Sequence, residues 1–473
     1  MASMEKRLAW TVFGTLALVG LPVWRADAVG ILQDQIYKAR DKVFPALVHV
    51  QPISEVFERG KKTKQTAVGS GVVIDKEGYV ITNYHVAGKA VKAICTLSNK
   101  ERLPATLVGG DPLTDLAVVK LDLSDYDGEL HWAQLGDSSK IETGQFVLAM
   151  GSPLSLSRSI SQGIISCPDR YLGDEMTLED GERTGGYHTW IQTTAAINFG
   201  NSGGPLVDLD GEIVGINTRT VVGADGLGFS IPSNVVREIT KQIIEEGAVK
   251  RSWIGIDLQP HQELDAFFKG QAMKGVLVSN VEPRSPADTA GIVAGNWIST
   301  VNGEEVDARF EEEIPAVLRR ISELPVGSTV ELDLRRVDPT NPERATEMTV
   351  RVVTREMGKT RGEEKEFAKW GFSAQSLTLS KLLELNRPRK NGVLVSSVSG
   401  VTTKEPTDLV QDDIVVEVNG EPVSNLDSLT TVYERYEQSE PERIVLKTER
   451  NNIVHFTVLY PKYGAAHPAE GGS

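Results

Sequence analysis

The chain has 473 residues, a formal net charge of −15, 40% hydrophobic residues and 24% charged residues. This composition is typical of a soluble globular protein, and the length predicts two to four domains. The acidic balance argues against a protein that binds nucleic acid by neutralising phosphates. With only two cysteines, Cys95 and Cys167, the chain has neither a disulfide framework nor a cysteine-based metal cluster, and we expect no metal or other cofactor.

The N-terminus has the pattern of a secretory signal. Lys6 and Arg7 precede an uncharged run over residues 8–24, and Ala26-Asp27-Ala28 follows with small-x-small spacing. We therefore predict a signal peptide over residues 1–28. The alternative, which stays open, is that residues 8–24 are retained as a membrane tether.

Residues 36–247 predict an all-β domain. Short runs rich in β-branched and aliphatic residues alternate with Gly, Asp and Ser turns, as in residues 71–75, 116–120 and 146–150. Such a pattern indicates a β-barrel or sandwich. From Ser233 to Glu246 the apolar residues have helical spacing, which predicts a packing helix at the end of the domain.

The rest of the chain contains an internal repeat. Gly275-Val-Leu-Val-Ser279 recurs as Gly392-Val-Leu-Val-Ser396, and Val301-Asn-Gly303 recurs as Val418-Asn-Gly420, each displaced by 117 residues. The shared offset predicts two tandem domains, at 251–355 and 367–462. We expect a solvated linker between them at 356–366 and a disordered tail at 463–473.

A glycine-rich segment carries the first chemical signal. Gly200-Asn-Ser-Gly-Gly-Pro205 leaves the hydroxyl of Ser202 unobstructed and lets backbone amides turn inward. These are the local requirements of an acyl-transfer nucleophile with an oxyanion hole. The segment that we assign to the hole is Gly200, Asn201 and Ser202, with the amides of Gly200 and Ser202 as the expected donors; a plain glycine turn is the alternative.

Two further residues complete a hydrolytic constellation. His85 lies in Thr82-Asn-Tyr-His-Val86 at the end of a strand pattern, and Asp115 directly precedes an apolar strand. His85 would accept the proton of Ser202, and a buried carboxylate would orient the imidazole. Asp111 is the rival carboxylate; we favour Asp115 because the strand that follows would bury it.

These segments, together with Ala195 to Leu206, Gly228 to Pro232 and the two repeats, resemble the HtrA (Deg) serine proteases over nearly the whole chain. The resemblance implies a mostly β protein: a chymotrypsin/trypsin-like double β-barrel protease domain at 36–247 followed by two PDZ domains. It also implies a bacterial periplasmic endopeptidase that degrades unfolded envelope proteins and assembles as a homotrimer or a multiple of trimers. No nucleic-acid partner is expected.

The resemblance extends to the peptide-binding loops of the repeats. PDZ domains bind the C-terminal carboxylate of a peptide in an Φ-Gly-Φ loop. Ile254-Gly255-Ile256 and Trp370-Gly371-Phe372 match that loop.

Several features bear on specificity and assembly. The pocket that we predict is formed by Ala196, Ile197, Gly228 and Phe229; it has no charge to pair with Lys or Arg, so small or medium aliphatic residues are expected at the cleaved position. The segment 53–66 is short where cage-forming relatives carry a long loop. We expect the cysteines to be buried free thiols. No ATP-binding loop is visible, so the hydrolysis is expected to be ATP-independent.

A second class of function remains open. The repeats also fit a chaperone or scaffold that binds exposed C-termini and keeps its proteolysis latent. We favour the enzyme because His85, Asp115, Ser202 and the flanking glycines are all present.

Overall fold

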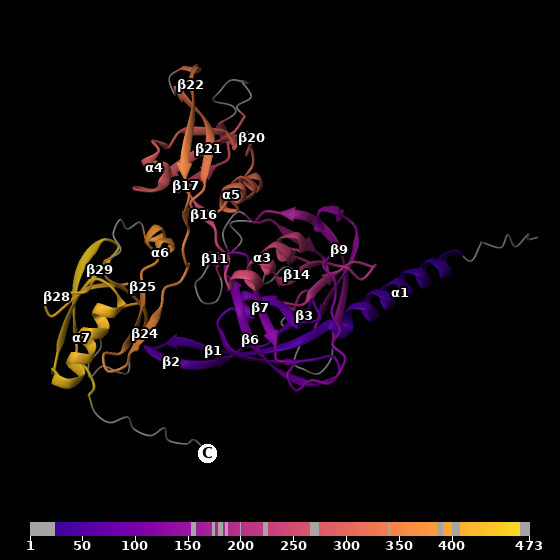
Figure 1. The fold of residues 1–473 in the computed structure, drawn as a ribbon, viewed down its shortest axis with the longest axis horizontal. Helices are drawn as coiled ribbons and strands as arrows, with labels where there is room; N and C mark the ends of the chain where they lie inside the picture. Colours follow the sequence, from indigo (N-terminus) through magenta and orange to yellow (C-terminus); the bar gives the residue numbers. More distant parts are fainter. Residues whose placement is uncertain are drawn as a thin grey trace, which may run out of the picture.

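A computed structural model describes residues 24–152, 158–172, 176–177, 183–184, 188–198, 200–220, 226–264, 274–338, 341–385, 391–399 and 407–463. The predicted signal segment before residue 24 and the predicted tail after residue 463 lie outside these residues. Figure 1 shows three folded domains, with helix α1 (Trp24–Val43) projecting from the first. In the described part of the chain, no helix is both long and apolar enough to span a membrane.

The first barrel is a seven-stranded sheet that closes through pairing of β1 with β5. The strands Gly69–Val73 and Leu116–Leu121 consist mostly of small and aliphatic residues, and their valines suit a pleated surface packed on a core. Its strands are β1 (Leu47–Glu58), β2 (Lys61–Thr66), β3 (Gly69–Val73), β4 (Tyr79–Asn83), β5 (Ala90–Thr96), β6 (Arg102–Asp111) and β7 (Leu116–Leu121).

The second barrel is closed in the order β12-β15-β14-β13-β8-β9. Its strands are β8 (Phe146–Gly151), β9 (Ser159–Arg170), β12 (Trp190–Thr193), β13 (Pro205–Val207), β14 (Ile213–Thr220) and β15 (Gly228–Pro232). Helix α3 (Ser233–Glu246) follows with the predicted bounds and buries Val236, Ile239 and Ile243. It ends at Gly247, whose left-handed φ of +76° suits a residue without a Cβ.

The short segment 53–66, expected to precede the first barrel strands, is a β-hairpin, because β1 continues to Glu58 and pairs with β2 from Ile53↔Thr66 to Glu58↔Lys61. The sequence did not reveal this, because Lys61–Thr66 is polar and exposed throughout. Figure 1 shows the hairpin reaching away from the barrel toward the last domain. Strand β5 holds Cys95, which is buried, and β9 holds Cys167, which is only half-buried; both thiols are free.

The first C-terminal domain contains a sheet in the order β17-β18-β19-β21-β22. Its elements are β16 (Ser252–Trp253), β17 (Ile256–Gln259), β18 (Val276–Val281), α4 (Pro286–Thr289), β19 (Asn296–Val301), β20 (Glu304–Glu305), α5 (Ile314–Ser322), β21 (Thr329–Asp338), β22 (Asn341–Val353) and β23 (Arg355–Glu356).

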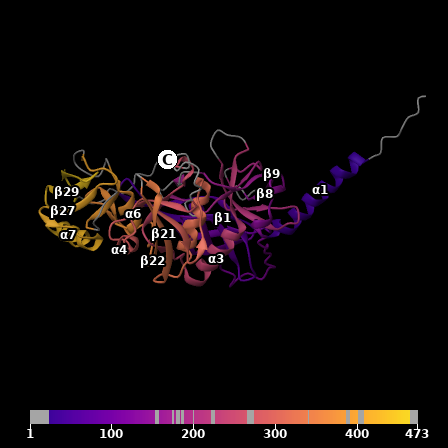
Figure 2. The same ribbon diagram turned by 90° about the horizontal axis from the view of Figure 1, so that it is seen from above.

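The second C-terminal domain repeats this order with one strand added at the edge, as β24-β25-β26-β27-β29-β30. Its elements are β24 (Glu364–Phe367), β25 (Phe372–Ser376), α6 (Leu379–Glu384), β26 (Val393–Val398), β27 (Ile414–Val418), β28 (Glu421–Pro422), α7 (Leu426–Ser439), β29 (Ile444–Arg450) and β30 (Ile453–Leu459). The expected linker at 356–366 is therefore not wholly a solvated connection, because its last residues form β24. Figure 1 shows the first C-terminal domain above the protease domain and the last domain, and the view from above shows the last domain at the end opposite α1 (Figure 2).

Candidate active site

The first barrel supplies His85 and Asp115. His85 lies on the single turn α2 (Tyr84–Ala87) after β4, and Asp115 ends a turn before β7 with a φ of +56°. The fully buried Asp115 carboxylate lies 2.8 Å from His85 Nδ1 and also accepts the His85 backbone N–H at 3.0 Å. With Nδ1 donating, the outer nitrogen Nε2 is left as a proton acceptor.

The backbone of Asp115 is fixed as firmly as its side chain. Its carbonyl oxygen accepts the Tyr84 N–H at 3.0 Å and the Asn83 Nδ2–H at 3.1 Å. Asn83 also donates to Thr218 Oγ1 at 3.2 Å, which links this turn to the second barrel. The end of β4 and the turn before β7 are thus joined by backbone and side-chain hydrogen bonds, which fix the position of the Asp115 carboxylate beside the imidazole.

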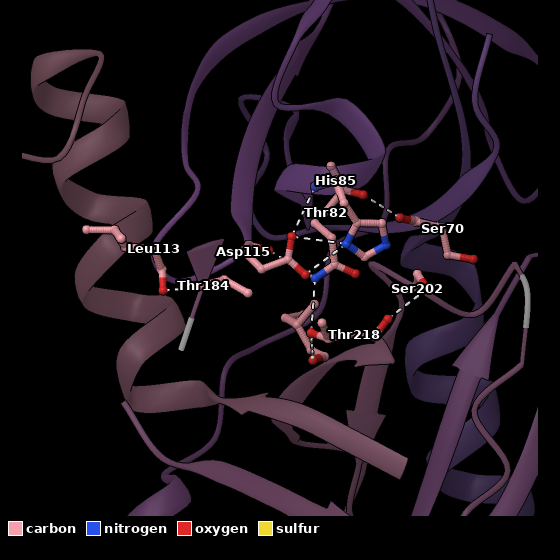
Figure 3. Close-up of polar contacts among 10 residues, drawn as sticks. Ser70, Thr82, His85, Leu113, Asp115, Thr184, Ser202 and Thr218 are labelled. Carbon is pink, nitrogen blue, oxygen red and sulfur yellow. Dashed lines mark hydrogen bonds and ion pairs between the residues drawn. The ribbon is translucent and has the colours of Figure 1, made fainter. Parts of the chain in front are cut away.

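The second barrel supplies Ser202, from the loop before β13. The imidazole of His85 lies between Asp115 and Ser202 (Figure 3). The Ser202 hydroxyl donates to the carbonyl oxygen of Thr218 at 2.9 Å. It would have to rotate away from Thr218 to donate to His85.

The glycines around Ser202 are required by close backbone contacts. Gly203 has a φ of +83°, and a Cβ there would lie 2.2 Å from Ser70 O. A Cβ on Gly204 would lie 2.2 Å from Met150 O. Only glycine allows the loop to lie this deep between the barrels.

The structure narrows the predicted oxyanion hole. Among the described residues, the backbone N–H groups of Gly200 and Ser202 have no acceptor, and Gly200 has a φ of +100°. The N–H of Asn201 instead donates to Asn198 O at 3.0 Å. A turn hydrogen bond therefore already uses the Asn201 amide, whereas the amides of the two expected donors have no acceptor among the described residues.

One residue of the site was missed by the sequence reasoning. Ser70, at the start of β3, donates to Gly200 O at 2.6 Å and accepts the Ser152 N–H at 2.7 Å. Thr82 Oγ1 in turn donates to Ser70 O at 2.7 Å. The run of small residues Gly69-Ser70-Gly71 was the only signal, and it reads equally well as an ordinary buried strand.

The four residues predicted to form the substrate pocket have different surroundings in the structure. Ile197 is buried, and its Cδ1 would lie 3.0 Å from a Cβ on Gly228, so it packs directly on that strand. Phe229 is 3% exposed and belongs to the barrel core. Ala196 has an exposed side chain, and its carbonyl accepts Ser161 Oγ–H at 2.7 Å. No charged side chain stands among these four residues.

Asp111, the rival carboxylate, is engaged elsewhere. Its two oxygens accept Arg251 Nη1–H and Nη2–H at 2.8 and 2.7 Å, and Thr114 donates to it at 2.5 Å. Burial alone would raise the pKa of Asp111, but the Arg251 charge and these hydrogen bonds hold it below its usual value. Because Arg251 is the first residue of the first C-terminal domain, this buried pair ties that domain to the turn that carries Asp115.

The two predicted peptide-binding loops have matching backbones. Gly255 has a φ of +85° and Gly371 a φ of +80°. Each loop leads directly into a strand, β17 or β25. Over the described residues, no group of three or more potential metal ligands is found.

The double barrel, with a histidine, a buried aspartate and a serine meeting between its halves, defines a trypsin-like serine peptidase. Residues 69–216 match the trypsin-like peptidase domain model, and residues 277–336 match the PDZ domain model. The chain is 32% identical to the periplasmic serine endoprotease DegP of Salmonella typhimurium, over 83% of this chain and 76% of that protein. It is 31% identical to DegP of Escherichia coli K12, over 85% and 78%.

Solved structures of HtrA-type proteases are also similar to this chain. An HtrA-type protease, AlgW, determined with a tripeptide has a TM-score of 0.57 at 29% identity, covering 68% of this chain and 97% of that chain. The chain therefore belongs to the HtrA/DegP family, with a trypsin-like domain and a PDZ domain, and is a serine endoprotease.

Proposed function

We propose that this chain is an ATP-independent endopeptidase of the bacterial periplasm that cleaves unfolded envelope proteins and is regulated by peptide binding to its PDZ domains. In this proposal His85 is the general base, Asp115 its orienting carboxylate and Ser202 the nucleophile. The observation that carries it is the buried Asp115 carboxylate, 2.8 Å from His85 Nδ1 on the side of the ring away from Ser202.

The contacts support a defined sequence of proton movements. His85 Nε2 takes the proton of Ser202 Oγ as the oxygen attacks the scissile carbonyl, and the buried carboxylate stabilises the imidazolium that forms. The N–H groups of Gly200 and Ser202, which have no acceptor among the described residues, would donate to the oxyanion. The imidazolium then protonates the leaving amine, and water hydrolyses the acyl-enzyme by the same route.

The orientation of the Ser202 hydroxyl supports a form of the enzyme that is not yet arranged for attack. Its hydroxyl donates to Thr218 O rather than to His85, and attack requires that this hydrogen bond break. The same observation favours the second candidate function, a chaperone or scaffold that binds exposed C-termini while proteolysis stays latent.

The pocket supports cleavage after small or medium aliphatic residues. Ile197 Cδ1 would lie 3.0 Å from a Cβ on Gly228, so an apolar side chain lines this part of the predicted pocket. A buried Lys or Arg would also find no counter-charge among the four pocket residues, and desolvating an unpaired cation is costly.

The proposed domain organisation places the protease at 36–247 and PDZ domains at 251–355 and 367–462. The second PDZ assignment rests on its strand order and on the left-handed glycine that both loops share. Removal of residues 1–28 as a signal, or their retention as a tether, and assembly as a trimer or a multiple of trimers complete the proposal.

Casein degradation tests the function. The wild-type chain and Ser202→Ala would be compared with and without a peptide that has a hydrophobic C-terminus and a free carboxylate. Cleavage by the wild type alone, stimulated by the peptide, is the expected result. If neither protein cleaves but both suppress aggregation of an unfolded client, the chaperone function replaces the enzymatic one.

A further inference from the structure

The two C-terminal domains differ at the strand that follows the glycine loop. In the first domain β17 is the terminal strand of its sheet, and none of the described strands lies on its outer edge. In the second domain β24 pairs along the corresponding edge of β25. An extended peptide that binds a PDZ domain adds at such an edge.

Strand β24 has the direction of a bound peptide. It is antiparallel to β25, from Glu364↔Gln375 to Phe367↔Phe372, so its last residue reaches the glycine loop. It also lies beside α7 on the second domain, since both elements contact each other and β25. A C-terminal peptide would enter with the same polarity and end at the same loop.

Phe367 occupies the place of a peptide's last residue. Its carbonyl oxygen accepts the N–H groups of Trp370 at 2.9 Å and Gly371 at 3.0 Å, the loop amides that would otherwise bind a terminal carboxylate. Its side chain is fully buried, with ring centroids 5.4 Å from Phe372 and 5.1 Å from Tyr433 on α7. Both the carboxylate position and the side-chain pocket are therefore filled.

The corresponding groups of the first domain are free of such a segment. Within the described part of the chain, the N–H groups of Ile254 and Gly255 have no acceptor. The segment that enters this loop is β16, which pairs with β23 through Ser252↔Glu356 instead of folding back on β17. The path of the chain into each loop thus decides whether the groove is open.

We propose that the second domain's peptide groove is occupied by its own strand β24, and that the first domain is the site that binds C-terminal peptides. This inference rests on the proposed regulation by peptides and assigns it to one of the two repeats.

The occupied face serves instead as a docking platform for the protease hairpin. The backbone N–H of Gly60, at the hairpin tip, donates to Ser397 Oγ at 2.9 Å, and a Cβ on Gly60 would lie 2.7 Å from Gly371 O. The N–H of Lys62 donates to Glu366 Oε2 on β24 at 3.0 Å. The hairpin therefore touches both the glycine loop and the strand that fills the groove.

This docking brings the second domain next to the proposed catalytic histidine. A groove lined by Tyr84 and His85 is also lined by Ser397 and Val410 of the last domain and by Arg361, just before it.

Hydrogen exchange tests the assignment without disturbing the fold. The full chain carrying Ser202→Ala, which prevents cleavage, is mixed with a decapeptide that ends in apolar residues and a Phe with a free carboxylate; the C-terminal amide of the same peptide is the control. The peptide should slow exchange in fragments covering 254–259. Fragments covering 372–376 should already be protected in the free chain and should not change. Peptide-dependent protection at 372–376, or fast exchange there in the free chain, would overturn the proposal.

A strand-breaking variant gives a second readout. Ser376 N–H donates to Glu363 O, and hydrogen-bonded pairs alternate along an antiparallel ladder, so Lys365 and Ala374 form the next such pair. Lys365→Pro removes that donor without creating a core cavity, and Lys365→Ala is the matched control that keeps it. By calorimetry we expect one peptide per chain for the parent and for Lys365→Ala, and two for Lys365→Pro. Two sites in the parent contradict the inference, as does a single site in Lys365→Pro when fragment 372–376 exchanges fast.

Casein cleavage by the chain with an intact Ser202 separates this inference from the proposed function. If casein is cleaved but the peptide protects the second domain, only the assignment of the sites fails. If casein is not cleaved while the peptide protects 254–259, the assignment stands and the enzymatic proposal fails.

Discussion

The buried ion pair between Arg251 and Asp111 gives the sharpest stability prediction. Its side chains are 10% and 4% exposed and meet through two parallel hydrogen bonds of 2.8 and 2.7 Å. In Arg251→Met the methionine side chain fills much of the volume of the aliphatic part of the arginine, but the Asp111 carboxylate loses its counter-charge. It keeps the hydrogen bond from Thr114.

Removing one partner of a buried pair costs about 3–5 kcal/mol, because the remaining charge has to stay desolvated. For a domain of this size each kcal/mol shifts Tm by roughly 2–4 °C, so the Tm of the protease domain should fall by roughly 6–20 °C. The double variant Asp111→Leu, Arg251→Met should recover most of that loss, because no buried charge is left.

Differential scanning calorimetry of the full chain measures this shift. Lys250→Met is the matched control. Lys250 is the neighbouring residue and forms an exposed ion pair with Glu246, so the Tm of this variant should stay at the wild-type value. The reasoning is refuted if Arg251→Met melts within about 2 °C of the wild type, or if the double variant is no more stable than Arg251→Met.

Three further predictions concern the site and its surroundings. Asp115→Asn should lower kcat/KM by roughly 10⁴-fold on a chromogenic peptide, because the amide would hold His85 in the wrong tautomer; a loss under tenfold would remove Asp115 from the proposed role. Ser70→Ala leaves Gly200 O and Ser152 N–H without their partner, so kcat should fall about tenfold or more with a smaller change in KM; an unchanged kcat would contradict a positioning role. Burial lowers the pKa of His188 to about 3 although Asp111 opposes the shift, so between pH 6.5 and 3 the unfolded chain binds a proton that the folded chain does not. The free energy of unfolding should therefore decrease as the pH is lowered through this window, by about 2 kcal/mol at pH 5. In urea titrations His188→Phe should flatten this pH dependence, and an unchanged dependence would refute the role of His188.

The sequence alone predicted those elements whose pattern is complete within a short segment or recurs along the chain. Helix α3 has its predicted bounds because an apolar stripe at helical spacing is a complete local description of an amphipathic helix. The strands at 116–121 and 146–151 likewise follow from short aliphatic runs between turns. The displaced Gly-Val-Leu-Val motifs became β18 and β26, at equivalent places in two domains.

The sequence could not decide features that depend on which segments meet in space. The choice between Asp111 and Asp115 remained an argument from burial, whereas the structure places Asp115 under His85 and pairs Asp111 with Arg251, 140 residues away. The hairpin strand Lys61–Thr66 pairs with β1 but is exposed throughout, so it has no apolar alternation from which the pairing could be predicted.

The sequence by itself therefore determined the class of fold, the tandem repeat and the segments that carry the candidate chemistry, because these follow from residue type and spacing. Only the tertiary structure decided which groups are already hydrogen-bonded: the Asn201 amide by Asn198, the Ser202 hydroxyl by Thr218, and the second glycine loop by Phe367. The first and the third are turn hydrogen bonds between residues three or four apart, and the second joins residues 16 apart. All three depend on the backbone conformation of these loops within the paired strands, which residue type and spacing do not specify.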